Sequence, residues 1–181
     1  LQNARIVEQC LRMRATPEFN VRDQAMAENV MWILERNPER KMVIWAHNGH
    51  ISRRPFWMGA YLGGQLGADY LPIAFATARG TYYAMQQQGS ERVHDLQAPA
   101  AGSIEDYFDR SGDPCLLLDL RAAEKGSPAS GWLHEARPMR SLGALATSQQ
   151  FYPANAAWMY DGIIFIAETT AALQLPSAAA P

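Results

Sequence analysis

Two of the four histidines of this chain, His47 and His50, stand three residues apart in the string WAHNGH. Imidazoles titrate near neutral pH, so a close pair can supply both a general acid and a general base. The same two side chains can also bind a metal ion. Asn48 carries an amide that can polarise a carbonyl or orient a water molecule, and Gly49 lets the backbone come close to a ligand. We therefore predict a functional site at this position.

The residues before the pair predict which element holds it. Residues 41–46 form a short, nearly continuous apolar run, which is typical of a strand buried on both faces. The histidines would then follow the carboxyl end of a strand, where open α/β sheets bind their ligands. In the alternative interpretation, one histidine is only hydrogen-bonded at the end of the strand and the other is solvated.

A helix is expected to precede this strand, beginning near Asn20 and ending near Asn37. Such a helix begins on the side of the sheet where the following strand ends. Arg22 and Asp23, in its first turn, are therefore expected beside His47. Asp23 could hold an imidazole in one tautomer or could simply cap the helix, and Arg22 could help to hold the carboxylates of the site.

The rest of the sequence alternates between helices and strands. We predict helices at 58–66 and 103–108, strands at 70–77, 115–120 and 160–168, and a return of the chain as a hairpin after Gly80. This alternation indicates the α/β class, with a largely parallel sheet flanked by helices. One domain is expected over residues 1–175, followed by a tail at 176–181.

Polar segments separate some of these elements. Residues 86–102 are polar and rich in turn residues, so they are expected to form a surface excursion. His94 and His134 lie in polar segments without obvious partners, and both are expected to be surface residues.

The composition excludes several classes of protein. The chain has 181 residues, 48% of them hydrophobic and 19% charged, with a net charge of −2, which is ordinary for a globular protein and offers no basic surface for nucleic acid. Cys10 and Cys115 are isolated, which favours a reducing compartment. No stretch approaches the ~20 apolar residues of a membrane span. We therefore expect a cytoplasmic protein that does not bind membranes.

Familiar catalytic motifs are missing from the sequence. It contains no GxSxG, no GxxxxGK[ST] and no GxGxxG after a strand, so serine hydrolases, nucleotide hydrolases and dinucleotide oxidoreductases lose support. His47 and His50 supply only two metal ligands, fewer than a catalytic zinc usually takes. We expect no required cofactor and leave a divalent metal at these two histidines open.

Four longer strings of the sequence are informative as a set. They are RDQAMAENVMWILE, KMVIWAHNGHISR, MGAYLGGQLGADYLPIAFATARGTYYA and, near the end, RSLGALATSQQFYPANAAWMYDGIIFIAETTAA. Together they resemble the erythromycin esterase family, and the resemblance covers roughly residues 21–171. It implies an α/β hydrolytic fold, unrelated to the serine α/β-hydrolases, that opens the lactone of a macrolide antibiotic with an activated water and so confers resistance.

The resemblance also implies roles for individual residues. His47 and His50 match the two active-site histidines of the WAHNxH motif. The family's general base is another histidine, near a glutamate in the N-terminal half, and no such motif precedes Leu1. The resemblance therefore predicts the C-terminal part of an esterase, incomplete at its N-terminus and acting on a small ester. Its oligomeric state is left open.

Two other functions stay open at this stage. One is a metal-dependent hydrolase of another ester or of an amide, with His47 and His50 as ligands. The other is a protein without catalytic activity that binds a ligand or haem.

Overall fold

The computed structural model describes residues 2–16, 18, 20–86 and 89–173, and the chain divides into two compact units. The first unit comprises Leu1–Ala74, Leu118–Glu135 and Asn155–Ile163, and the second comprises Phe75–Leu117, Ala136–Ala154 and Ile164–Pro181. The single domain expected over residues 1–175 stays a prediction. The tail expected at residues 176–181 lies outside the described residues.

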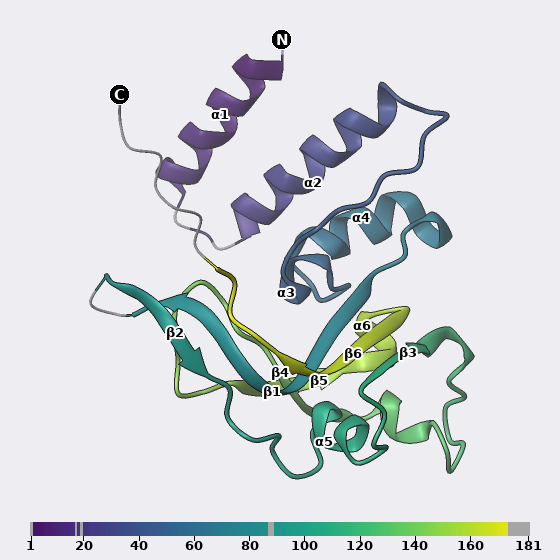
Figure 1. Ribbon diagram of the computed structural model, residues 1–181. Helices are drawn as coiled ribbons and strands as arrows, with labels where there is room; N and C mark the ends of the chain where they lie inside the picture. The colour runs from purple at the N-terminus through teal and green to yellow at the C-terminus, as the bar shows by residue number, and fades with distance from the viewer. Residues whose placement is uncertain (1, 17, 19, 87–88, 174–181) are drawn as a thin grey trace. The chain divides into compact units, whose positions relative to one another are not determined.

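The first unit is built mainly from helices. They are α1 (Gln2–Ala15), α2 (Asn20–Glu35), α3 (Asn48–Ile51), α4 (Met58–Leu66) and α6 (Ala156–Met159), with single 3₁₀ turns at Gly67–Asp69, Leu120–Ala122 and Gly131–His134 (Figure 1). An apolar core lies between α2 and α4 and contains the buried residues Ala27, Met58, Leu62 and Tyr70. The predicted helices at 58–66 and near Asn20 are confirmed.

Polar side chains hold α1 against α2. Gln9 is 2% exposed, and its amide donates to the Glu28 carboxylate at 3.0 Å and accepts from the Asn29 amide at 3.0 Å. Arg12 donates to the same carboxylate at 3.2 Å. Because buried amides are stable only when hydrogen-bonded, these contacts fix the two helices in one register.

Residues 41–46 form no strand, so the prediction of a buried strand before the histidines is wrong. Their side chains alternate instead: Ile44 and Ala46 pack against the core between α2 and α4, whereas Val43 and Trp45 are 92% and 83% exposed. An apolar run forms a buried strand only where neighbouring strands pair with it and both faces are covered. Within the described residues, no strand pairs with this segment.

The strands lie mostly in the second unit. One sheet has the order β2-β1-β6-β3, from β1 (Ile73–Met85), β2 (Glu91–Asp95), β3 (Cys115–Asp119) and β6 (Gly162–Thr169), and a second sheet pairs β4 (Ala136–Arg140) with β5 (Phe151–Asn155) (Figure 1). The predicted α/β class, a sheet flanked by helices, is confirmed.

The strand directions are more mixed than the expected largely parallel sheet. β1 and β2 are antiparallel, with Tyr82 opposite His94. β3 and β6 are antiparallel as well, because the Leu120 N–H donates to the Asp161 carbonyl at one end and the Ala167 N–H to the Pro114 carbonyl at the other. The short connection between β1 and β2 allows a hairpin, whereas parallel pairs need long crossovers.

The predicted hairpin after Gly80 is also wrong in position. β1 continues through Gly80 to Met85 and turns back only at β2, inside the expected surface excursion. Gly80 has a φ of 114°, and a Cβ atom there would lie 1.9 Å from the Thr169 carbonyl oxygen. The glycine is needed for the close approach of β6, and it does not mark a turn.

A short helix, α5 (Ile104–Asp109), completes the second unit and confirms the prediction at 103–108. Ser103 accepts from the Asp106 N–H at 3.1 Å, and the Asp106 carboxylate accepts from the Gly102 N–H at 2.9 Å. These bonds satisfy donors that the first turn of a helix leaves free.

In the part of the chain that the structure describes, no helix is both long and apolar enough to cross a membrane.

Candidate active site

Three predicted site residues of the first unit meet at the ring of His50. Asp23 is fully buried near the start of α2, and its Oδ1 atom lies 2.7 Å from His50 Nδ1. The same oxygen accepts the Met58 N–H at 2.9 Å, at the first residue of α4. On the other side of the ring, Arg22 Nη1 lies 3.0 Å from His50 Nε2. The imidazole is therefore held at both nitrogens.

These contacts define the tautomer of His50. A guanidinium nitrogen only donates, so His50 Nε2 accepts from Arg22 and the ring proton is on Nδ1, where it is donated to Asp23. A proton that arrives at Nε2 must displace the contact with Arg22. The resulting imidazolium would be stabilised by the buried carboxylate of Asp23.

His47 has the opposite arrangement. It is the N-cap residue of α3, and its Nδ1 atom accepts the Gly49 N–H at 3.0 Å. In the neutral ring the proton is therefore on Nε2, where it can be donated. The centroids of the His47 and His50 rings lie 6.3 Å apart. The neutral His47 ring thus carries its proton on Nε2, whereas the His50 ring carries its proton on Nδ1.

Two tyrosine hydroxyls support the loop that carries the histidines. Tyr70 donates to the Ile51 carbonyl at 2.5 Å, and Tyr160 donates to the Asn48 carbonyl at 3.2 Å. Burial raises the pKa of Tyr70 to about 12, with smaller opposing effects of Arg53 and Asp161, and burial also raises the pKa of Tyr160. Both hydroxyls therefore remain donors throughout the neutral range.

The loop continues into a partly buried ion pair. Arg53 donates to the Asp161 carboxylate at 2.5 Å and to the Tyr70 carbonyl at 3.1 Å. The Arg53 N–H also donates to the Met159 carbonyl. These bonds connect the loop to the segment just before β6, more than 100 residues later in the chain.

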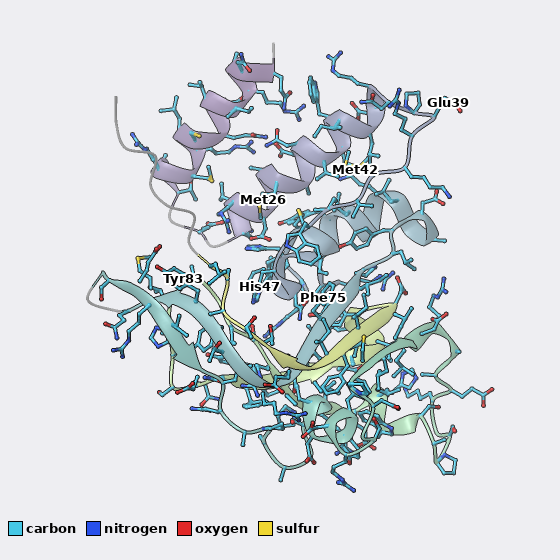
Figure 2. All side chains as sticks on the ribbon, viewed as in Figure 1. Met26, Glu39, Met42, His47, Phe75 and Tyr83 are labelled. Atoms are coloured by element: carbon cyan, nitrogen blue, oxygen red, sulfur yellow. The ribbon has the colours of Figure 1, made fainter. Side chains whose placement is uncertain are left out.

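Two further residues shape the site. A Cβ atom at Gly49 would lie 3.1 Å from His47 Nδ1 and 3.3 Å from the Trp57 ring, so this glycine leaves room for both side chains. The Trp57 ring packs edge-on against His50, with 5.2 Å between centroids. Figure 2 shows His47 on the loop beside α3.

Trp57, Tyr70 and Tyr160 were not predicted from the sequence as residues of the site. No motif or spacing marks them, since Trp57 follows a turn and Tyr160 is remote from the histidines in sequence. Only the fold brings them to the loop. Asn48 was expected to act through its side-chain amide, and that role stays a prediction.

No group of three His, Cys, Asp or Glu side chains among the described residues is placed to bind a metal ion. Both ring nitrogens of His50 have protein partners and His47 Nδ1 accepts the Gly49 N–H, so His50 could bind a metal ion through Nε2 only by losing its contact with Arg22.

Fold and site together define an α/β protein with two neighbouring histidines, one of which is held by a buried carboxylate. The family model for erythromycin esterases matches residues 1–169, and the chain belongs to this family.

Individual proteins agree with the family match. The chain is 29% identical over 112 residues to an erythromycin esterase type II of Escherichia coli, covering 52% of this chain and 26% of the relative. It is 24% identical over 164 residues to YbfO of Bacillus subtilis (strain 168), which carries a provisional hydrolase name. This match covers 84% of this chain and 35% of the relative. A crystal structure of a Bacillus cereus protein superposes with a TM-score of 0.84 at 25% identity. The superposition covers 93% of this chain and 44% of the Bacillus cereus chain. The chain thus spans about a quarter to a third of the curated relatives it matches.

Proposed function

We propose that this chain provides the histidine site of an ester hydrolase that adds water to the lactone of a macrolide antibiotic. The observation that carries the proposal is the short contact between buried Asp23 and His50, which leaves His50 Nε2 as a proton acceptor. Membership of the erythromycin esterase family supports the reaction class, and the name of the Escherichia coli relative supports the substrate.

In the proposed mechanism, His50 takes the role of base that the family resemblance assigns to a histidine outside these 181 residues, and it then acts as an acid. Its Nε2 atom takes a proton from water, and the oxygen of that water attacks the ester carbonyl carbon. Asp23 stabilises the imidazolium. The tetrahedral intermediate then breaks the bond to the alcohol oxygen, and His50 returns the proton to that oxygen. The products are a carboxylic acid, which ionises at neutral pH, and an alcohol.

Two neighbouring donors stabilise the charge that develops on the carbonyl oxygen. Arg22 loses its contact with His50 when Nε2 is protonated, which frees the guanidinium to bind an oxyanion. His47 donates from Nε2, since its Nδ1 atom is occupied by the Gly49 N–H. The two histidines therefore have different roles, although the sequence motif presents them as an equivalent pair.

The test is to incubate the 181-residue chain with erythromycin and to follow the gain of one water by mass spectrometry. We expect ring opening that His50→Ala lowers by about 10²- to 10⁴-fold, as for the loss of a general base. His134→Ala, at a histidine that contacts the Ala123 carbonyl and lies outside the site, is the matched control and should keep full activity. A folded chain that leaves erythromycin intact would contradict the proposal for this chain and would favour a base outside the 181 residues.

A further inference from the structure

The second unit has an open hollow of about 350 Å³ beside the β1–β2 hairpin, separate from the histidine site in the first unit. Its volume falls near the lower end of the usual range for small-molecule sites, ~300–1,000 Å³. The lining side chains that decide its chemistry are Tyr82, Arg92, His94, Asp95, Gln97 and Gln150. We propose that the hollow binds a neutral, hydroxyl-rich ligand the size of one or two sugar rings.

The buried amide side chain of Gln150 lines the hollow. Gln150 is 3% exposed, and its side-chain oxygen accepts from the Arg140 guanidinium and, at 3.0 Å, from the Gln97 N–H. These donors fix the orientation of the amide, so its Nε2 group is the free end. Among the described residues, that Nε2 group has no acceptor. Gln150 Nε2 is not one of the buried polar atoms without a partner in the described part of the chain, so it keeps access to solvent and can donate to a ligand oxygen in place of water.

The Gln150 amide is also held rigidly, because its partner Arg140 is fixed by several other hydrogen bonds. Arg140 is 6% exposed, and its guanidinium donates to the carbonyls of Ala78 at 3.0 Å and Gln97 at 2.7 Å. The Glu105 carboxylate, which is fully buried, accepts the Arg140 N–H at 2.9 Å. A ligand would therefore meet a preorganised donor and would not have to order this part of the chain.

The rings of Tyr82 and His94 also line the hollow. Tyr82 and His94 are directly opposite in the β1–β2 ladder, with ring centroids 5.4 Å apart and planes tilted by 31°. His94 Nε2 lies 3.3 Å from the Ala84 carbonyl oxygen, which fixes the orientation of the imidazole. An aromatic surface of this kind packs against the C–H face of a sugar ring while the hydroxyls at its edge reach polar groups.

The charge of the lining favours a neutral ligand. Arg92 and Asp95 have opposite formal charges, and the other lining residues are His94 and uncharged side chains. An anion would meet the Asp95 carboxylate, and a cation would meet Arg92. Sugar hydroxyls both donate and accept, so they can satisfy the carboxylate, the guanidinium and the Gln150 amide together.

The experiment is saturation-transfer NMR on the 181-residue chain with methyl α-D-glucopyranoside, methyl β-D-galactopyranoside and maltose as probes, and with inorganic phosphate as a competitor. We expect saturable binding of at least one sugar, unaffected by phosphate. Tyr82→Ala should weaken it about fivefold, the order expected for the loss of one aromatic contact. Tyr82→Phe, which keeps the ring, should retain most of the affinity.

Tyr83→Ala is the matched control, since Tyr83, labelled in Figure 2, is the neighbouring ring in β1 and is not one of the residues that line the hollow. It should leave sugar binding unchanged. Three outcomes would overturn the proposal: no transfer to any sugar from the folded chain, equal weakening by the Tyr82→Ala and Tyr83→Ala variants, or displacement of the sugar by phosphate. A thermal melt of each variant shows whether a loss of binding is only a loss of folding.

Discussion

His50 depends on a single carboxylate for the properties that the proposed reaction needs. Asp23 Oδ1 receives both the His50 ring N–H and the Met58 N–H, so one oxygen orients the imidazole and fixes the start of α4. Its position on the first turn of α2 was predicted from the sequence, and the alternatives of helix capping and imidazole orientation were left open. The structure shows a contact with the imidazole, together with a role at the start of a different helix.

The first prediction concerns Asp23→Asn. An amide keeps the shape of the side chain but cannot stabilise an imidazolium by charge, so we expect kcat for erythromycin hydrolysis to fall by about 100-fold with little change in KM. Asp69→Asn, at an exposed aspartate after α4, is the control and should leave both constants unchanged. If the Asp23→Asn variant had wild-type kcat, the carboxylate would have only a structural role.

The second prediction concerns pH and Tyr70. The pKa of this phenol is raised from 10.0 to about 12 in the folded chain, so the folded state holds the proton more tightly than the unfolded state. The corresponding stability is complete below pH 10 and is lost as the pH rises towards 12. The midpoint of urea unfolding should therefore fall across this window. In the Tyr70→Phe variant the fall should be shallower, since nothing titrates at this position.

The same variant has a measurable cost at neutral pH. Tyr70→Phe removes the hydrogen bond to the Ile51 carbonyl, so we expect a loss of about 1 kcal/mol in the free energy of unfolding at pH 8. An identical pH dependence for wild type and variant would show that Tyr70 does not contribute to the alkaline transition.

At the scale of elements, the predictions that succeeded rest on local signals. α4 is confirmed with the bounds predicted from its apolar spacing and the glycine that follows it, and α5 is confirmed from its capping serine. The failures concern partners that are remote in sequence. Residues 41–46 have the composition of a buried strand, but composition does not show whether another strand pairs with them. Gly80 predicted a turn from the sequence, whereas the structure needs a glycine there because the Thr169 carbonyl lies too close for a side chain.

The third prediction compares two glycines of the same helix. A Cβ atom at Gly59 would lie 2.2 Å from the Ile51 carbonyl oxygen and 2.4 Å from that of Ser52, so α4 is in backbone contact with the histidine loop. Gly59→Ala must push the two apart, and we expect a loss of about 1–3 kcal/mol in stability together with a loss of esterase activity. Urea unfolding and the erythromycin assay measure these effects.

Gly64→Ala provides the matched control for this contact. No atom lies within 4 Å of a Cβ atom at Gly64, so the substitution should stabilise α4 by up to about 1 kcal/mol and leave activity unchanged. Equal effects of the two substitutions would show that helix propensity, and not the contact with the loop, determines the result at Gly59.

At the scale of the whole molecule, the candidate site could be predicted only where its residues are close in sequence or mark an element. His47, His50, Arg22 and Asp23 were found in this way. Tyr160 and Asp161 support the same loop from the other end of the chain, and a single sequence contains no signal that relates them to it. The hydrogen bonds of buried Arg140 in the second unit could not be predicted from the sequence either, because their acceptors are mostly backbone carbonyls.

The last prediction concerns self-association. Val43 is 92% exposed beside Trp45, which is 83% exposed, and an exposed apolar segment with strand-like composition tends to pair between molecules. We expect the apparent mass in size-exclusion chromatography with light scattering to rise with protein concentration, and Val43→Lys to reduce this rise. Leu173→Lys is the matched control, because Leu173 is 94% exposed and lies outside the segment. If both substitutions reduced association equally, net charge would be the cause; if only Val43→Lys did so, residues 41–46 would be the contact surface.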